Sequence, residues 1–308
     1  MGGPPKLEQI VVAVVDEAST KFAGLVSGEL DLAGVSPTMA SLVARDPTLA
    51  LMTPPALFST VLAFNTTRPP FDDARVRRAV SMSIDRARIV QAAVAGYATP
   101  AGGAIPPGLP VIPAKASGAD TTQADSLLDA AGWRRSSSSV RARQGKSLAV
   151  TILTVGSGDM AVEQLVQADL RARGFDVGIR VAELATFLAA LRAPSRQFDF
   201  AITGIPGDIA LGQLSALFAS AQRGGALDYT GFHSVVLDDA LLTARRATPT
   251  DANRAWHAVD SQLADSMPVA WLYHARGVQG RSRRLENVQM DLRGELTSVA
   301  QWTRRSTP

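Results

Sequence analysis

The chain has 308 residues, of which 46% are hydrophobic and 19% are charged, a balance typical of a globular protein that can bury a full core. It contains no cysteine, which excludes disulfide bonds, thiolate nucleophiles and cysteine-ligated zinc sites. The formal net charge is +3, and the paired arginines Arg283-Arg284 and Arg304-Arg305 have no interleaved aromatic residues. We therefore expect no nucleic-acid partner.

Neither a membrane span nor an export signal is visible in the sequence. No apolar run approaches the roughly 20 residues that cross a bilayer, and the first six residues lack the apolar core of a signal peptide. Two interpretations follow: the protein stays inside the cell, or the start of a longer gene product is missing.

Residues 1–70 predict an alternation of short strands and helices. Residues 10–15 form a continuous apolar run, typical of a strand that is covered on both faces. Residues 16–27 predict a helix that Gly28 ends as a C-cap. The other elements expected here are a strand at 30–33, a helix from Ser36 to about Asp46, and strands near 48–52 and 59–64.

A rigid turn, Pro69-Pro70-Phe71-Asp72-Asp73, ends in aspartates that we expect to cap the next predicted helix. The apolar residues of that helix (Val76, Ala79, Val80 and Ile84) share one face. A further helix is expected from Asp85 to Gly96. Residues 97–118, rich in glycine, proline and alanine, predict an extended surface loop, and residues 136–139 predict a loop tip.

From residue 148 onward the pattern alternates between strand and helix. The expected strands are 148–153, 177–181, 198–203 and 269–273, and the expected helices are 159–173, 182–191, 237–244 and 255–263. This βαβαβ run predicts an α/β fold, with a mostly parallel sheet and helices on its faces. The tail from 275 to 308 is irregular, with a short strand or helix near 295–302.

No set of residues in the sequence indicates catalysis. The three histidines, His233, His257 and His274, lack the spacing of a helical zinc pair, and no pattern pairs them with a nucleophile. The segment 156–159 lacks the lysine and the glycine spacing of a phosphate loop, so a strand-to-helix turn is expected there. We expect no enzyme activity, no cofactor and no metal site; a hydrolase is the alternative with the least support.

One carboxylate stands out by its position. The predicted strand 198–203 leads into Gly204-Ile205-Pro206-Gly207-Asp208, and ligands of open α/β sheets bind beyond the carboxyl ends of strands. Asp208 there could hold a cationic amine through a charge-assisted hydrogen bond. The other interpretation is an ordinary turn aspartate after Pro-Gly, and position alone favours the turn.

Several stretches, in this order and spacing, carry a family resemblance. They are Ser27-Gly28-Glu29-Leu30-Asp31, Phe64-Asn65, Pro70-Phe71-Asp72-Asp73-Ala74-Arg75-Val76-Arg77-Arg78-Ala79-Val80, Ile84-Asp85-Arg86, Gly96-Tyr97-Ala98-Thr99-Pro100-Ala101, Ala131-Gly132-Trp133, Phe198-Asp199-Phe200, Asp265-Ser266-Met267-Pro268 and Gln301-Trp302. Through them the chain resembles the family 5 (dipeptide, oligopeptide and nickel type) substrate-binding proteins of ABC importers. The resemblance covers nearly the whole chain.

The resemblance implies a periplasmic-binding-protein-like type II fold, with two lobes, a hinge and an incomplete first lobe. Residues 1–70 plus 275–308 would form the partial first lobe and 71–274 the second, with crossings near 70–85 and 270–285. It also implies a monomer in the periplasm or at the cell surface, whose export signal is absent from this chain. Such a protein captures peptides or similar small solutes and docks on an ABC permease in the membrane; the alternative is a ligand-sensing module of a regulator or receptor with the same fold.

The resemblance also bears on the segment that ends in Asp208. It looks like a family loop in which a tryptophan follows the first glycine and the final aspartate holds the α-amino group of a peptide ligand. The implied ligand-binding residues are Asp208, Ile205, Gly204 and Gly207. Ile205 departs from the tryptophan, and Leu211-Gly212 replaces an Asp-Pro pair that often follows. These departures imply a ligand unlike a standard peptide, or a degenerate copy of the family.

Overall fold

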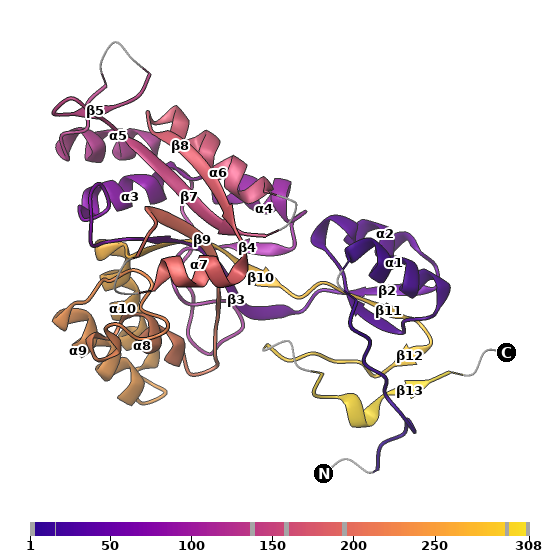
Figure 1. Ribbon diagram of the computed structural model, residues 1–308. Coiled ribbons are helices and arrows are strands. Elements are labelled where there is room, and N and C mark those ends of the chain that lie inside the picture. The colour runs from indigo at the N-terminus through magenta and orange to yellow at the C-terminus, as the bar shows by residue number, and fades with distance from the viewer. Residues whose placement is uncertain are drawn as a thin grey trace. The chain divides into compact units, whose positions relative to one another are not determined.

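A computed structural model describes residues 4–15, 17–135, 139–156, 160–192, 196–292 and 296–305. The chain divides into two compact units (Figure 1). Unit 1 comprises residues 1–57, 90–99 and 275–308, and unit 2 comprises 58–89 and 100–274. The chain therefore passes between the units four times, once inside the helix α4 (Arg86–Ala93).

A six-stranded sheet with the strand order β4-β10-β3-β9-β7-β8 forms the centre of unit 2, and its strands β3, β4 and β10 also include residues of the unit 1 ranges. These strands are β4 (Ala98–Pro100), β10 (Val269–Arg276), β3 (Pro55–Phe64), β9 (Phe200–Pro206), β7 (Ala149–Val155) and β8 (Asp176–Ala182). β7 runs parallel to β8 and β9, which confirms the predicted βαβαβ run. β3 runs antiparallel to β9, so the sheet is mixed.

Helices cover both faces of this sheet (Figure 1). They are α3 (Ala74–Ser83), α5 (Thr121–Ala130), α6 (Ala161–Ala172), α7 (Leu184–Leu191), α8 (Gly212–Phe218), α9 (Val235–Arg246) and α10 (Ala252–Ser266). Val61 and Ala63 of β3 pack with buried side chains of α8, α9 and α10, and Ala201 of β9 packs with those of α7. On the opposite face the rings of Phe64, Phe71 and Phe200 contact one another.

The turn before α3 is joined to the end of α10 through one buried arginine. Asp73 caps α3 by accepting the backbone N–H of Arg75, as the sequence predicted. Arg77 points inward, and its guanidinium donates to the carbonyl oxygens of Phe71, Ser266 and Met267. Because these carbonyls lie nearly 200 residues apart in sequence, Arg77 ties distant segments of unit 2 together.

Unit 1 has a smaller, three-stranded antiparallel sheet in the order β1-β11-β2. Its elements are α1 (Ala18–Ser27), β1 (Leu32–Gly34), the 3₁₀ helix η1 (Pro37–Met39), α2 (Ala40–Arg45), β2 (Leu49–Met52), β11 (Gln279–Ser282), β12 (Leu285–Glu286), the 3₁₀ helix η3 (Val299–Gln301) and β13 (Thr303–Arg304). Its core includes Leu25, Val43, Leu49 and Val278. The short elements β5 (Ala142–Arg143), β6 (Lys146–Ser147) and the 3₁₀ helix η2 (Ser220–Gln222) belong to unit 2.

The prediction of a buried strand at residues 10–15 is wrong. These residues form neither strand nor helix, and Val11, Val12 and Val14 are 78%, 85% and 90% exposed. A segment becomes a strand only when its backbone hydrogen-bonds to a neighbouring strand. In the described part of unit 1, the nearby strand β1 pairs with β11 alone, so residues 10–15 have no strand partner. The predicted loop tip at 136–139 and turn at 156–159 lie largely outside the described residues.

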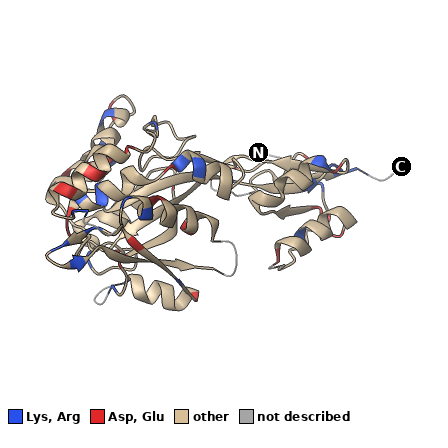
Figure 2. Ribbon diagram, turned by 90° about the horizontal axis from the view of Figure 1, so that it is seen from above, with Lys and Arg blue, Asp and Glu red and all other residues tan. Residues whose placement is uncertain are grey.

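None of the described helices combines the length and the apolar character of a bilayer span. Figure 2 shows basic and acidic residues interspersed along the helices, with no single basic stripe in that view. The absence of a nucleic-acid partner stays a prediction.

Candidate functional site

The parallel strands β7, β8 and β9 end at one edge of the sheet, at Val155, Ala182 and Pro206. Phe58 of the antiparallel strand β3 lies directly opposite Pro206 and so reaches the same edge. We call this part of unit 2 the carboxyl edge. It is where ligands of open α/β sheets bind.

The loop that leaves β9 at the carboxyl edge is organised by Asp208. Its Oδ1 accepts the backbone N–H groups of Ala210 at 2.7 Å and Gly212 at 3.1 Å, and its Oδ2 accepts that of Gln213 at 2.9 Å. The turn interpretation therefore accounts for three of the roughly four acceptor positions of a carboxylate. Asp208 is only partly buried, so part of its side chain remains accessible. Its ligand-binding role stays a prediction.

Gly204 and Ile205 point to opposite faces of β9. A Cβ atom on Gly204 would lie 2.0 Å from the ring of Phe58, so only glycine lets this ring lie across the strand. Ile205 is 5% exposed and packs in the core with Val61 and Leu214. Gly207 lies in the loop and is partly buried. The four predicted site residues thus lie on one segment, but in different surroundings: Gly204 lies under the Phe58 ring, Ile205 is in the core, and Gly207 and Asp208 are partly exposed in the loop.

Exposed apolar side chains gather along the carboxyl edge. They are Phe58, Val155, Val181, Leu184 and Ile209, which we call the apolar rim. Most apolar residues of unit 2 are buried, so this rim is a candidate surface for the apolar parts of a ligand. No local pattern in the sequence indicated this rim, because its residues come from four separate segments.

Buried polar groups lie behind the rim. The Thr154 hydroxyl donates to Glu163 Oε1 at 2.6 Å, and both side chains are buried. Burial raises the pKa of Tyr273, while a hydrogen bond with Thr60 lowers it and the nearby charge of Glu163 raises it further. This set of buried polar residues was not identified from the sequence. The position of Glu163 in the first turn of α6, shortly after a strand, was a local signal for it.

The structure also brings together a serine and a histidine. Ser59 Oγ and His274 Nδ1 lie 2.8 Å apart, the separation of a nucleophile and its base. Both residues are buried, at 5% and 2% exposed, and burial lowers the pKa of His274 to about 4. An imidazole with so low a pKa is a weak base at neutral pH, and the contact joins β3 to β10. Among the described residues, no three potential ligands cluster as a metal site.

Comparison with known proteins agrees with this arrangement. Residues 1–223 match the family described as bacterial extracellular solute-binding proteins, family 5 Middle. The chain is 30% identical to the glutathione-binding protein GsiB of Shigella flexneri over 302 residues, 92% of this chain and 55% of that protein. It therefore spans about half the length of the curated relatives that it matches.

Two solved structures show the same fold. The oligopeptide-binding protein AppA from Bacillus subtilis, in complex with a nonapeptide, has a TM-score of 0.78 and 20% identity, with 95% of this chain and 60% of that chain covered. NikA from Brucella suis, in complex with Fe(III)-EDTA, has a TM-score of 0.82 and 21% identity, with coverage of 99% and 63%. The fold is that of the type II periplasmic binding proteins, and the chain belongs to family 5 of the bacterial extracellular solute-binding proteins.

Proposed function

We propose that this protein captures a peptide or similar small solute outside the cytoplasm, delivers it to an ABC permease, and does not convert it chemically. The observation that carries the proposal is the apolar rim beside Asp208, at the edge where α/β sheets bind ligands. The rim suits apolar ligand groups, and the last acceptor position of Asp208 suits an amine. Glutathione-binding GsiB and peptide-bound AppA, both similar to this chain, support this ligand class.

The division into two units supports the two-lobe interpretation. In this proposal residues 1–70 and 275–308 form a partial first lobe and 71–274 the second, and ligand stabilises a closed arrangement through its higher affinity for it. The chain passes from unit 1 to unit 2 between residues 57 and 58 and returns between residues 274 and 275. Residues 90–99 also belong to unit 1. The monomeric state and the location in the periplasm or at the cell surface belong to the same proposal.

Calorimetric titration of the protein with glutathione and a set of dipeptides tests capture directly. We expect saturable binding of at least one of these ligands and its recovery intact by mass spectrometry after long incubation. Binding of none of them would contradict the proposed ligand class. Recovery of a hydrolysed ligand would contradict the proposal that the protein is not an enzyme.

Asp208→Asn tests the amine contact. We expect it to weaken the ligand found above by about fivefold or more, equivalent to about 1 kcal/mol, because the ammonium group loses its charged acceptor. The matched control is Asp238→Asn, since Asp238 also accepts a backbone N–H, from Ser220 at 2.8 Å, and lies on α9. Equal affinities of the two variants would reject the role of Asp208.

A further inference from the structure

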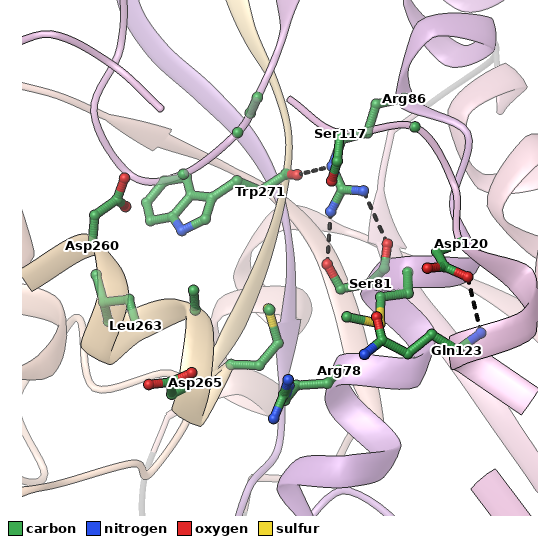
Figure 3. A pocket seen from close by; sticks show the side chains of 17 residues that line it. Arg78, Ser81, Arg86, Ser117, Asp120, Gln123, Asp260, Leu263, Asp265 and Trp271 are labelled. Atoms are coloured by element: carbon green, nitrogen blue, oxygen red, sulfur yellow. Dashed lines mark hydrogen bonds between the residues drawn. The ribbon is translucent and has the colours of Figure 1, made fainter. Parts of the chain in front are cut away.

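Unit 2 contains a cavity of about 490 Å³ whose lining includes none of the residues of the apolar rim (Figure 3). It lies between α3 and α10, beside Trp271 of β10, and segments 101–103 and 117–123 complete its wall. The volume falls within the range of about 300–1,000 Å³ that is usual for small-molecule sites. The charged groups of its lining indicate what it could hold.

The first wall is basic. Arg86 donates to four neutral acceptors: the Trp271 carbonyl at 2.7 Å, the Ser81 carbonyl at 2.9 Å, the Ile84 carbonyl at 3.4 Å and the Ser81 hydroxyl at 2.7 Å. Among the described residues no carboxylate lies within ion-pair distance of Arg86 or Arg78. Burial lowers the pKa of Arg86 to about 10, which reflects a cation without an acidic partner. A bound anionic group would supply that partner.

The second wall is acidic and comes from α10; a third carboxylate of the lining, Asp120, lies in segment 117–123 and accepts the backbone N–H of Gln123 at 2.9 Å. Asp260 is buried, its Oδ1 accepts the backbone N–H of Ala104 at 2.7 Å, and burial raises the pKa of its carboxyl group. The backbone passes so close that a Cβ atom on Gly103 would lie 2.1 Å from Asp260 Oδ2. Asp265 follows on the same helix, is exposed, and has no ion-pair partner among the described residues.

Apolar groups complete the lining. The indole of Trp271 and the side chains of Met82, Leu263 and Met267 line the cavity together with the charged residues of both walls. Figure 3 shows Asp260 and Asp265 on α10, and Arg78 and Arg86 on other segments. A ligand with only a negative charge would be repelled by the aspartates, and a ligand with only a positive charge would be repelled by the arginines. A zwitterion whose charges are separated by a short apolar chain satisfies both walls.

We propose that this cavity binds a small zwitterion with separated charges. Its anionic group pairs with Arg78 and Arg86, its ammonium group pairs with Asp260 and Asp265, and its apolar chain lies against Trp271. An α-amino acid fits less well, because both of its charges sit on one carbon atom. This site is separate from the carboxyl edge and does not depend on the ligand that binds there.

The test uses 6-aminohexanoate as the probe, with hexylamine and hexanoate as singly charged analogues of similar length. Calorimetry and tryptophan fluorescence of the whole chain should show saturable binding of 6-aminohexanoate, at least about fivefold tighter than either analogue. Absence of saturable binding up to about 10 mM, or equal binding of an analogue, would overturn the proposal. This comparison needs no variant and so does not depend on the folding of one.

Two variants locate the probe. Arg78→Gln and Asp265→Asn each remove one charge from a side chain without a hydrogen bond or ion pair to other described residues, and each should weaken 6-aminohexanoate about fivefold. The matched controls on α9, Arg245→Gln and Asp239→Asn, should leave its affinity unchanged. Loss of binding in Phe58→Ala without loss in Arg78→Gln would place the probe at the carboxyl edge and refute the cavity site.

Discussion

The two units contain similar apolar runs with opposite fates. Residues 269–274 of β10 are all buried, at 8% exposed or less, because β10 lies between β4 and β3 and helices cover the sheet. Residues 10–15 in unit 1 contain only isoleucine, valine and alanine, yet most of their side chains are exposed. The difference lies in the neighbours, since an apolar run becomes a strand only where other strands and helices surround it.

The same contrast extends to the cores. Unit 2 surrounds its sheet with helices and fills both faces with buried side chains, so we infer that it holds most of the stability of the chain. Unit 1 has a small core around Leu25 and Val43 and a three-stranded sheet. Substitutions in the two units should therefore differ widely in their effect on the free energy of unfolding.

The largest effect is expected from Phe200→Ala in unit 2. The ring of Phe200 is fully buried and contacts those of Phe64 and Phe71, with centroids 6.3 Å and 5.2 Å away. Its removal leaves a cavity, and we expect a loss of about 3–5 kcal/mol in urea unfolding. Phe58→Ala, at an exposed ring on the adjacent strand, is the control. A loss below about 1 kcal/mol for Phe200→Ala would contradict a tightly packed unit 2.

Local patterns in the sequence predicted much of unit 2. The βαβαβ run and the cap of α3 by Asp73 follow from periodicity and from helix-capping chemistry, and the structure confirms both. The family motifs predicted the fold, which the solved relatives confirm. The failure at residues 10–15 has a simple cause: a sequence pattern reports the preference of a segment, but not whether a partner strand exists.

The candidate site was predictable only in part. The sequence placed Gly204 and Asp208 after a strand; Asp208 does lie in the loop beyond β9, whereas Gly204 lies within β9. It could not show that Phe58 covers Gly204, because this contact depends on the register between β3 and β9. The contacts Ser59–His274 and Asp260–Ala104 join residues 215 and 156 positions apart, beyond the reach of any local pattern.

A pH effect of intermediate size is expected from His274. Burial lowers its pKa to about 4, whereas an unfolded histidine titrates near 6.5. Between these values the unfolded chain binds a proton that the folded chain does not, so lowering the pH from 7 to 5 should cost about 2 kcal/mol of stability. The contribution is complete above the unfolded value and is lost as the pH falls toward about 4.

Urea unfolding at pH 7 and pH 5 measures this loss. His274→Asn should lose about 2 kcal/mol less than the unmodified protein between the two pH values. Asp260 acts in the opposite direction, because burial raises its pKa and the folded chain then takes up a proton before the unfolded one. An unchanged pH response in His274→Asn would show that His274 is accessible to protons in the folded state.

The smallest effect is expected in unit 1, from Val12→Ser. The Val12 side chain is 85% exposed and the segment around it has no strand partner, so its replacement removes little buried apolar area. We expect a change within about 0.5 kcal/mol in urea unfolding at low protein concentration. Val43→Ser is the control, because Val43 is fully buried in the core of the same unit and its truncation should be clearly destabilising. If Val12→Ser instead cost as much as Val43→Ser, residues 10–15 would be covered in solution, and the contrast between the two apolar runs would not hold.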